Sequence, residues 1–224
     1  MPLILILVEC GLEIIPRQIR NHSSVKKNRT NKIYSSQLLD NALHHSAMKN
    51  LKNSIKRGRP DIVHLCLLNA LGSPLNKSSN LKLYIHTIKN KIFKFNPEIR
   101  MAKNFNRFKG LMAKLLIDGD IKYNGTNLIT QFPGNLKMLI ESFEDHEILL
   151  FSSKGALIKN HREIFTKDIS KNLIAIIGGF QKSGFSKEIL HLSENSISIS
   201  EYPLEAWIVV SKTISYYEII HEII

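Results

Sequence analysis

The 224-residue sequence predicts an α/β protein with a mostly parallel β-sheet, folded as a single domain. Two apolar runs, residues 3–8 and 173–180, are typical of parallel strands that are buried on both faces. Strand-like runs alternate along the chain with segments of helical periodicity, as they do in sheets whose strands are connected by helices. No internal repeat, heptad pattern or low-complexity linker divides the chain.

The N-terminal half supplies the first strands and helices of this prediction. After the strand at 3–8, the basic, Ser- and Asn-rich residues 21–36 predict an exposed loop. Helical spacing of apolar residues predicts a helix within 38–56, and a buried helix begins near Asp61. The other elements of this half are strands at 81–86 and 92–95, paired as a hairpin, and a helix from Phe105 to Leu116.

The C-terminal half has a different pattern. Glycines and a proline within residues 118–134 predict a loop or a small excursion, and short apolar runs predict strands at 147–152, 173–180 and 197–199. Leu204 to Ile224 predicts a closing helix whose apolar side chains fall all round it rather than on one stripe. One face can pack on the sheet, whereas another needs a partner, so the helix favours a homodimer. A fully internal helix in a monomer is the alternative.

Positive charge is concentrated in one part of the chain. The chain has 31 Lys and Arg against 19 Asp and Glu, a formal net charge of +12. Residues 20–114 hold 20 of these bases but only three acids, Asp40, Asp61 and Glu98. Such a field concentrates polyanions at the surface and speeds their capture, so the sequence favours a nucleic acid as partner. A lysine-rich composition alone would spread the bases through both halves.

Other compositional features exclude or disfavour several classes of protein. No apolar run approaches the roughly 20 residues that span a bilayer, and the opening strand lacks the basic leader of a signal peptide. Cys10 and Cys66 cannot form a disulfide framework, which favours a cytoplasmic location. Cys66 lies in an apolar helix, as expected of a buried structural thiol, and neither cysteine nor the scattered histidines predict a metal site. The motifs of the common hydrolases and of P-loop proteins are absent.

Three stretches carry candidate chemistry. The glycine loop at 177–184 follows a buried strand and therefore lies at the carboxyl edge of the sheet, where α/β proteins bind ligands, although it lacks the G-x-G-x-x-G spacing. Arg59 lies two residues before Asp61 and next to Pro60, so the carboxylate can orient the guanidinium; helix capping by Asp61 is the simpler alternative. Residues 96–108 interleave three bases with phenylalanines, which suits contacts to phosphates and bases, although those phenylalanines also suit a core.

Seven motifs in order extend this pattern over nearly the whole chain: Arg59-Pro60-Asp61-Ile62, Ser73-Pro74-Leu75-Asn76, Tyr84-Ile85-His86-Thr87, Asn96-Pro97-Glu98-x-Arg100, Arg107-Phe108-x-Gly110-Leu111-Met112, Ile177-Gly178-Gly179-Phe180 and Ser198-Ile199-Ser200-x-Tyr202-Pro203-Leu204-x-Ala206. The set resembles the pseudouridine-N1 methyltransferase family of small-subunit ribosome biogenesis, in its compact archaeal form. The resemblance implies a SPOUT-type sheet with a deep C-terminal trefoil knot, an exception to the rule against threaded loops. It also implies binding of S-adenosylmethionine in the knot, small-subunit rRNA as the partner, and a homodimer.

The resemblance assigns roles to individual residues of a single domain over 1–224, with a basic RNA-binding N-terminal half and a cofactor-binding knot at about 147–224. Arg59 contacts the rRNA, Asp61 holds the side chain of Arg59 in place, and these two residues form the catalytic pair. Arg100, Lys103 and Arg107 are further RNA contacts; Lys103 replaces the family's usual Arg and so loses a bidentate fork. The cofactor loops map to Gly178, Gly184, Ile199, Ser200, Glu201, Tyr202, Pro203 and Leu204.

The implied reaction explains why so few chemical groups are needed. Methyl transfer from a sulfonium to a ring nitrogen is an in-line displacement that requires no metal, only a flipped-out, oriented base whose N–H proton is weakened. The pair of Arg59 and Asp61 can favour the anionic base, with Asp61 as the base or as the orienting group. The alternative function is a non-catalytic rRNA-binding assembly factor on the same fold. A Rossmann-type oxidoreductase is disfavoured because its glycine fingerprint is missing.

Overall fold

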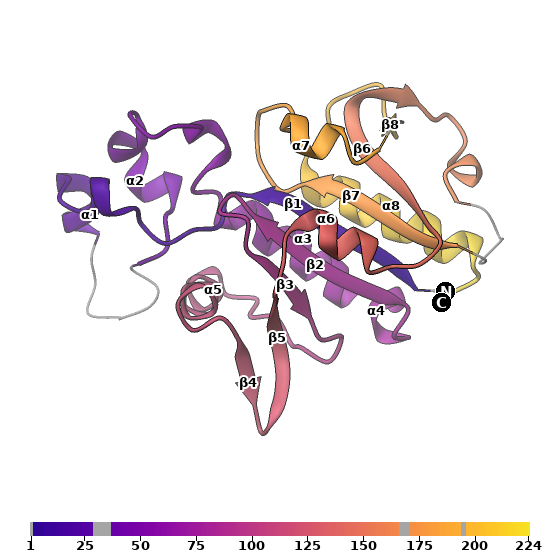
Figure 1. The fold of residues 1–224 in the computed structure, drawn as a ribbon, viewed down its shortest axis with the longest axis horizontal. Coiled ribbons are helices and arrows are strands. Elements are labelled where there is room, and N and C mark those ends of the chain that lie inside the picture. Colours follow the sequence, from indigo (N-terminus) through magenta and orange to yellow (C-terminus); the bar gives the residue numbers. More distant parts are fainter. Residues whose placement is uncertain (1, 29–36, 166–170, 194–195) are drawn as a thin grey trace.

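The computed structural model describes residues 2–28, 37–165, 171–193 and 196–224. Its centre is an eight-stranded sheet in the order β4-β5-β3-β2-β1-β7-β6-β8 (Figure 1). The strands are β1 (Leu3–Cys10), β2 (Leu81–Thr87), β3 (Ile92–Phe95), β4 (Ile121–Tyr123), β5 (Thr126–Phe132), β6 (His146–Leu157), β7 (Asn172–Gly178) and β8 (Ser196–Ser198). Strands β2, β1, β7, β6 and β8 run parallel, whereas β3, β5 and β4 extend the sheet in antiparallel pairs. The α/β fold with a mostly parallel sheet is therefore confirmed.

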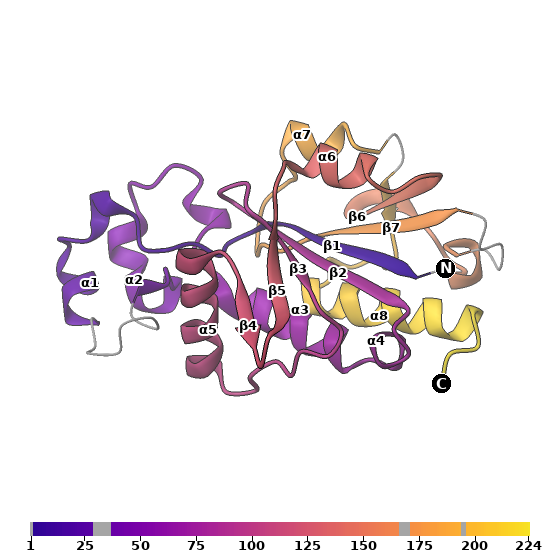
Figure 2. The ribbon, with the colours of Figure 1, turned by 60° about the horizontal axis from the view of Figure 1, so that its bottom comes forward.

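Helices cover both faces of this sheet (Figure 2). One face carries α3 (Pro60–Gly72), α4 (Pro74–Lys77), α5 (Phe105–Asp118) and α8 (Ala206–Ile220), and the other carries α6 (Leu136–Glu141) and α7 (Lys187–Leu190). The leucines of β1 belong to the core beneath α3, α5 and α8, whereas its alternate residues Ile4, Ile6 and Val8 belong to the core beneath α6 and α7. Every residue of β1 is buried, and all of them except Glu9 are apolar, as expected of a parallel strand covered on both faces.

Two hairpins form the antiparallel side of the sheet. The predicted hairpin of β2 and β3 is confirmed, with Asn90 in the left-handed region of its turn (φ 56°). Residues 118–134, predicted as a loop or small excursion, instead contain the hairpin of β4 and β5, which turns at Asn124 and Gly125. The turn residues were visible in the sequence, but the strands are short and largely exposed. Pairing of β5 with β3, rather than an apolar pattern, explains this hairpin.

A small lobe, residues 14–28 and 37–58, lies beside the sheet on the left of Figure 1. It contains the 3₁₀ turns η1 (Arg17–Ile19) and η3 (Ser54–Lys56) and the helices α1 (Ser23–Lys27) and α2 (Asn41–Met48). The lobe has its own core of Ile15, Ile19, Val25, Leu39, Ala47, Met48 and Leu51. The predicted loop at 21–36 is therefore partly wrong, because burial of Val25 stabilises α1; residues 29–36 lie outside the described residues. The helix predicted at 38–56 is confined to α2.

The C-terminal elements follow the predicted order with different bounds. Strand β6 continues to Leu157, beyond the predicted end at 152, and the closing helix α8 is shorter than the predicted span of 204–224. A 3₁₀ turn, η4 (His161–Glu163), follows β6. Strand β8 meets β6 twice, because Phe151 and Ala156 both pair with Ile197. Within the described ranges, no helix is long and apolar enough to cross a membrane.

Candidate cofactor pocket and RNA-facing surface

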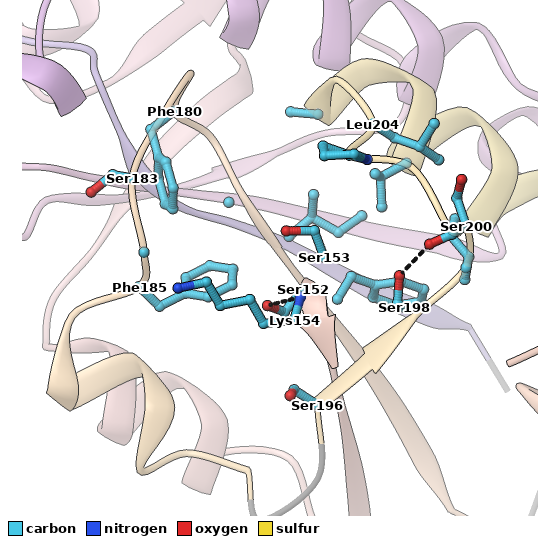
Figure 3. Close-up of a pocket in the computed structure, with 18 of the residues that line it drawn as sticks. Ser152, Ser153, Lys154, Phe180, Ser183, Phe185, Ser196, Ser198, Ser200 and Leu204 are labelled. Atoms are coloured by element: carbon cyan, nitrogen blue, oxygen red, sulfur yellow. Dashed lines mark hydrogen bonds between the residues drawn. The ribbon is translucent and has the colours of Figure 1, made fainter. Parts of the chain in front are cut away.

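A cavity of about 550 Å³ opens at the carboxyl edge of β6 and β7. Three segments far apart in the sequence line it: residues 151–154 at the bend of β6, the loop at 177–185 after β7, and residues 196–206 from β8 to the start of α8. Figure 3 shows Phe180 and Phe185 on one side of the cavity, and Ser198, Ser200 and Leu204 on the other. The position agrees with the general rule for ligand sites in parallel sheets.

Most of the predicted cofactor residues line this cavity. They are Gly178, Gly184, Ile199, Ser200, Tyr202, Pro203 and Leu204. Glu201 is exposed, and its side chain does not line the cavity. The sequence predictions therefore found two walls of the pocket.

The sequence does not predict the third wall of the cavity, which residues 152–154 form. Ser152, Ser153 and Lys154 follow the apolar part of β6 and contribute polar groups to the cavity. Their position offered a signal, because they end a parallel strand at the same edge as the glycine loop. The prediction stopped at Ser152 because a strand was expected to end there, whereas β6 bends and continues.

The lining combines apolar rings with hydroxyl groups. Phe180 and Phe185 stack edge to face with ring centroids 5.4 Å apart, while six serines, two lysines and several aliphatic side chains complete the wall. The Ser198 hydroxyl donates to the Ser200 carbonyl at 2.8 Å, and the amide of Tyr202 donates to the Ser200 hydroxyl at 3.0 Å. Apolar walls with a few fixed polar groups suit a small amphiphilic ligand.

The two glycines after β7 are needed for close packing. A Cβ on Gly178 would lie 2.8 Å from a ring carbon of Phe180, and one on Gly179 would lie 2.4 Å from the sulfur of Cys10. Neither glycine has a positive φ. Close approach of the backbone, rather than left-handed geometry, therefore explains the glycine pair.

Arg59 and Asp61 form the predicted fork. Arg59 is the N-cap residue of α3, and its Nε and Nη2 donate to the two carboxylate oxygens of Asp61 at 2.8 and 2.6 Å. The N-cap residue is Arg59 rather than Asp61, and both carboxylate oxygens of Asp61 accept from the guanidinium, so the simple capping alternative is wrong. The hydrogen bonds that Arg59 donates to Asp61 raise the pKa of Arg59, against partial burial, and the charges of Asp61, Glu205 and Asp40 contribute in the same direction.

The pair of Arg59 and Asp61 is linked through the backbone to the glycine loop beside the cavity. The amide of Arg59 donates to the Gly11 carbonyl at 3.0 Å, and the amide of Gly11 donates to the Gly179 carbonyl at 3.4 Å. Glu205, whose charge acts on Arg59, directly follows the pocket residue Leu204. Backbone hydrogen bonds thus connect the catalytic candidates to the glycine loop that contributes Gly178 and Phe180 to the cavity.

The other RNA-binding candidates are exposed. Arg100 and Lys103 lie between β3 and α5, and Arg107 lies in the first turn of α5. His64 of α3 hydrogen-bonds to the Ala102 carbonyl at 2.7 Å, which connects this segment to the helix that begins at the fork. Phe108 is buried against His64, with ring centroids 4.3 Å apart, as expected of a core residue.

The basic half is not all surface. Lys56, Arg57 and Lys109 are buried in ion pairs with Glu9, Glu13 and Asp40, respectively. Burial of charge is tolerated only with such partners, so these three bases have structural roles. The other bases in the described part of the lobe are exposed, namely Arg17, Arg20, Lys26, Lys27, Lys49 and Lys52, whereas Asp40, the acid within its described residues, is buried.

Cysteines and metal ligands do not form a site in the part of the chain that the structure describes. Cys10 and Cys66 are free and buried, and burial raises the pKa of both thiols. Cys66 is therefore a structural thiol rather than a nucleophile. Within the same residues, no group of three or more His, Cys, Asp or Glu could hold a metal ion.

A mostly parallel sheet with a glycine- and serine-lined cavity at its carboxyl edge is typical of α/β proteins that bind a small ligand at this position. The chain belongs to the EMG1/NEP1 methyltransferase family, whose model matches residues 5–218. Among curated proteins, it is 41% identical over 227 residues to the ribosomal RNA small subunit methyltransferase Nep1 of Staphylothermus marinus, covering 100% of this chain and 98% of that protein. It is 43% identical over 217 residues to that of Saccharolobus solfataricus, covering 96% of each chain. Its structure is similar to that of Archaeoglobus fulgidus Nep1 bound to S-adenosylhomocysteine, with a TM-score of 0.87, 32% identity, and coverage of 99% of this chain and 100% of that chain.

Proposed function

We propose that this protein transfers a methyl group from S-adenosylmethionine to ring nitrogen N1 of a pseudouridine in small-subunit rRNA during ribosome biogenesis. The observation that carries this proposal is a cavity whose glycine loop is joined, through the backbone of Gly11, to the pair of Arg59 and Asp61. The family supports it, as do the names of the relatives and the product-like ligand of the Archaeoglobus protein. We further propose that the protein acts in the cytoplasm.

The cavity fits the proposed cofactor in size and chemistry. Ligand pockets of roughly 300–1,000 Å³ hold molecules of this size. Ile199, Leu204 and the ring of Phe180 would cover the apolar adenine. The Ser152 hydroxyl, which accepts from the Lys154 amide, would donate to the ribose or the amino-acid end, and the Ser198 hydroxyl, which donates to the Ser200 carbonyl, would accept. The bound cofactor would supply the electrophilic methyl group.

Arg59 and Asp61 would supply the other groups that the reaction needs. In the transfer, the bond from methyl carbon to sulfur breaks, the bond to N1 forms, and the N1 proton must leave. Arg59 would orient the base and stabilise its negative charge. Asp61 either accepts the proton or orients Arg59, and both of its oxygens already accept from the guanidinium. No step requires a metal or a covalent intermediate.

The RNA would lie along the exposed bases near the fork. Arg100, Lys103 and Arg107 lie close in sequence to Ala102, whose carbonyl is hydrogen-bonded to His64 of α3. The lobe adds further exposed bases without an exposed acid among its described residues. We propose that this surface binds phosphates of the rRNA, which fix its orientation independently of sequence.

We also propose that the C-terminal region, about 147–224, contains the deep trefoil knot. The double pairing of β6 with Ile197 supports this, because β8 lies against both parts of a bent strand. A Cβ on Gly155, within the bend, would lie 2.5 Å from the backbone of Ile197. Such close contact agrees with a chain passing through a tight loop.

The homodimer also remains a proposal, with a revised surface. On α8, Ile214 is buried in the core of its own subunit, so it cannot form the interface. Ile208 of α8 and Leu65 of the neighbouring α3 are each 38% exposed, and Trp207 is half-buried. We propose that this face of α3 and α8 meets a second copy.

The decisive experiment combines binding with methyl transfer. Purified protein, S-adenosylmethionine and a stem-loop RNA with one pseudouridine are incubated, and the digested RNA is analysed by mass spectrometry for N1-methylpseudouridine. We expect methylation of this RNA and none of the matched RNA with uridine at that position, whose N1 carries the sugar. RNA binding without heat of S-adenosylmethionine binding in calorimetry would instead support the assembly factor, and methylation of both RNAs would overturn the pseudouridine assignment.

A further inference from the structure

Lys56 is buried directly behind the cofactor cavity, although it does not line it. Its Nζ lies 2.6 Å from Glu9 Oε2, and each side chain of the pair is only 9% exposed. The same Nζ lies 4.6 Å from the ring centroid of Phe180, which lines the cavity. The lysine therefore contacts a pocket wall through a cation–π interaction.

Glu9 connects this pair to the other end of the pocket loop. The amide of Ser186 points to Glu9 Oε2 at 3.4 Å, and the Ser186 hydroxyl caps α7. Phe180 and Phe185, the two aromatic rings of this loop, pack against each other and face Gly178. The single ion pair thus contacts the loop near its beginning and near its end.

The backbone at Glu9 is strained. Glu9 has a φ of 53°, in the left-handed region that non-glycine residues rarely adopt. The neighbouring His86 helps to hold it, since the amide of Glu9 donates to His86 Nδ1 at 3.4 Å. Strain of this kind persists where surrounding contacts fix it and is frequent at functional sites.

If the ion pair of Lys56 and Glu9 had only a structural role, it would not need to contact the loop at 180–186. Burial of two charges costs about as much as their attraction returns, so a buried ion pair is weak evidence for a gain in stability. We propose that Lys56 is a positioning residue: through Glu9, Phe180 and Ser186 it holds the loop at 180–186 in the shape that binds the cofactor. This inference rests on the proposed function.

The chain offers a matched control. Lys109 is also buried in an ion pair, with Asp40 at 3.1 Å, and its Nζ also lies over a ring, that of Phe105, at 4.9 Å. Neither Phe105 nor Asp40 lines the cavity. A merely structural lysine should therefore behave the same at both positions.

The experiment compares Lys56→Met with Lys109→Met. Calorimetry measures the Kd of S-adenosylhomocysteine, and urea denaturation measures stability. We expect both variants to be destabilised, but only Lys56→Met to weaken S-adenosylhomocysteine binding, by about tenfold or more. Lys56→Arg, which keeps the cation, should restore most of the affinity, and the KM for S-adenosylmethionine should rise in Lys56→Met while RNA affinity stays unchanged.

Equal affinities of folded Lys56→Met and Lys109→Met would overturn the positioning role. If Lys56→Met does not fold, Glu9→Gln serves in its place, because it removes the ion pair but keeps an acceptor for the Ser186 amide. Wild-type affinity in folded Glu9→Gln would equally overturn the proposal. Failure of the wild-type protein itself to bind S-adenosylhomocysteine would contradict the proposed function instead.

Discussion

The carboxylate of Asp61 accepts two hydrogen bonds from the guanidinium of Arg59, yet Asp61 is the more exposed partner. Its side chain is 43% exposed, whereas that of Arg59 is 17% exposed. The arginine is held between α3 and the Gly11 backbone, while the carboxylate faces solvent beside it. The carboxylate is therefore the part of the pair that is more accessible from solvent. The pair is too exposed to add much stability, which agrees with a functional role.

The first prediction concerns this pair. Asp61→Asn keeps the shape of the side chain but removes its charge, so we expect the single-turnover methylation rate to fall by about 100-fold or more. The Kd of S-adenosylhomocysteine and the urea midpoint should stay near those of the wild type. A methylation rate within about threefold of the wild type would exclude Asp61 as the catalytic base.

Gly178→Val tests the pocket wall. The added Cβ would lie 2.8 and 3.2 Å from ring carbons of Phe180 and Phe185, and the rings can yield only by moving within the pocket. We expect calorimetry to show no S-adenosylhomocysteine binding to a protein that remains folded. Gly72→Val is the control, because nothing lies within 4 Å of a Cβ at that position and Gly72 is outside the cavity. Normal binding heat in Gly178→Val would contradict the assignment of this loop.

RNA affinity should depend steeply on salt. With about four phosphate contacts per subunit, the log–log slope of affinity against salt is expected near −3 for a single strand. Replacing both Arg100 and Arg107 with Gln should reduce that slope by about 1.4, since each lost contact removes about 0.7. Lys137→Gln on α6, beneath the opposite face of the sheet, should leave it unchanged. Fluorescence anisotropy at several salt concentrations measures the slope, and equal slopes in wild type and double variant would refute these contacts.

Trp207→Glu should separate the proposed dimer. The side chain of Trp207 is half-buried on α8 next to the exposed Ile208. A charge at this position would therefore be desolvated in the proposed dimer but not in the free subunit. We expect light scattering to give the monomer mass and methylation to fall. Tyr123→Glu, an exposed aromatic on β4, should remain dimeric. Ile214→Glu, by contrast, should fail to fold because Ile214 is buried.

Acid should destabilise the protein through two buried histidines. Burial lowers the pKa of His44 and His86, and each Nδ1 accepts a backbone amide hydrogen, from Asp40 and Glu9, so the neutral ring is required. The unfolded chain protonates these rings below about pH 6.5, whereas the folded chain does so only at lower pH. The free energy of unfolding should thus fall as the pH drops from 6.5 through the lowered pKa values.

Urea denaturation at pH 7.5, 6.5 and 5.5 tests this dependence. We expect the midpoint to decrease at pH 5.5 and the decrease to be smaller in His86→Gln, which keeps an acceptor but cannot titrate. A midpoint that is constant or rises on acidification would contradict the role of the neutral rings.

Local sequence was sufficient wherever the responsible forces act over a few residues. The apolar run of β1 predicted a strand buried on both faces, and the spacing of Arg59 and Asp61 around a proline predicted their pairing. The motif order also identified the family. Periodicity, turn chemistry and short spacings are written within about ten residues, so they can be recognised without the fold.

The tertiary structure decided which charges and apolar groups are exposed. Lys56 and Lys109 looked like parts of a basic surface, but their partners Glu9 and Asp40 lie 47 and 69 residues away in the sequence. Ile214 became core, and residues 152–154 became a pocket wall, only because distant elements pack beside them. Burial and ion pairing depend on which segments the sheet order brings together, and no local pattern in a single sequence encodes that contact.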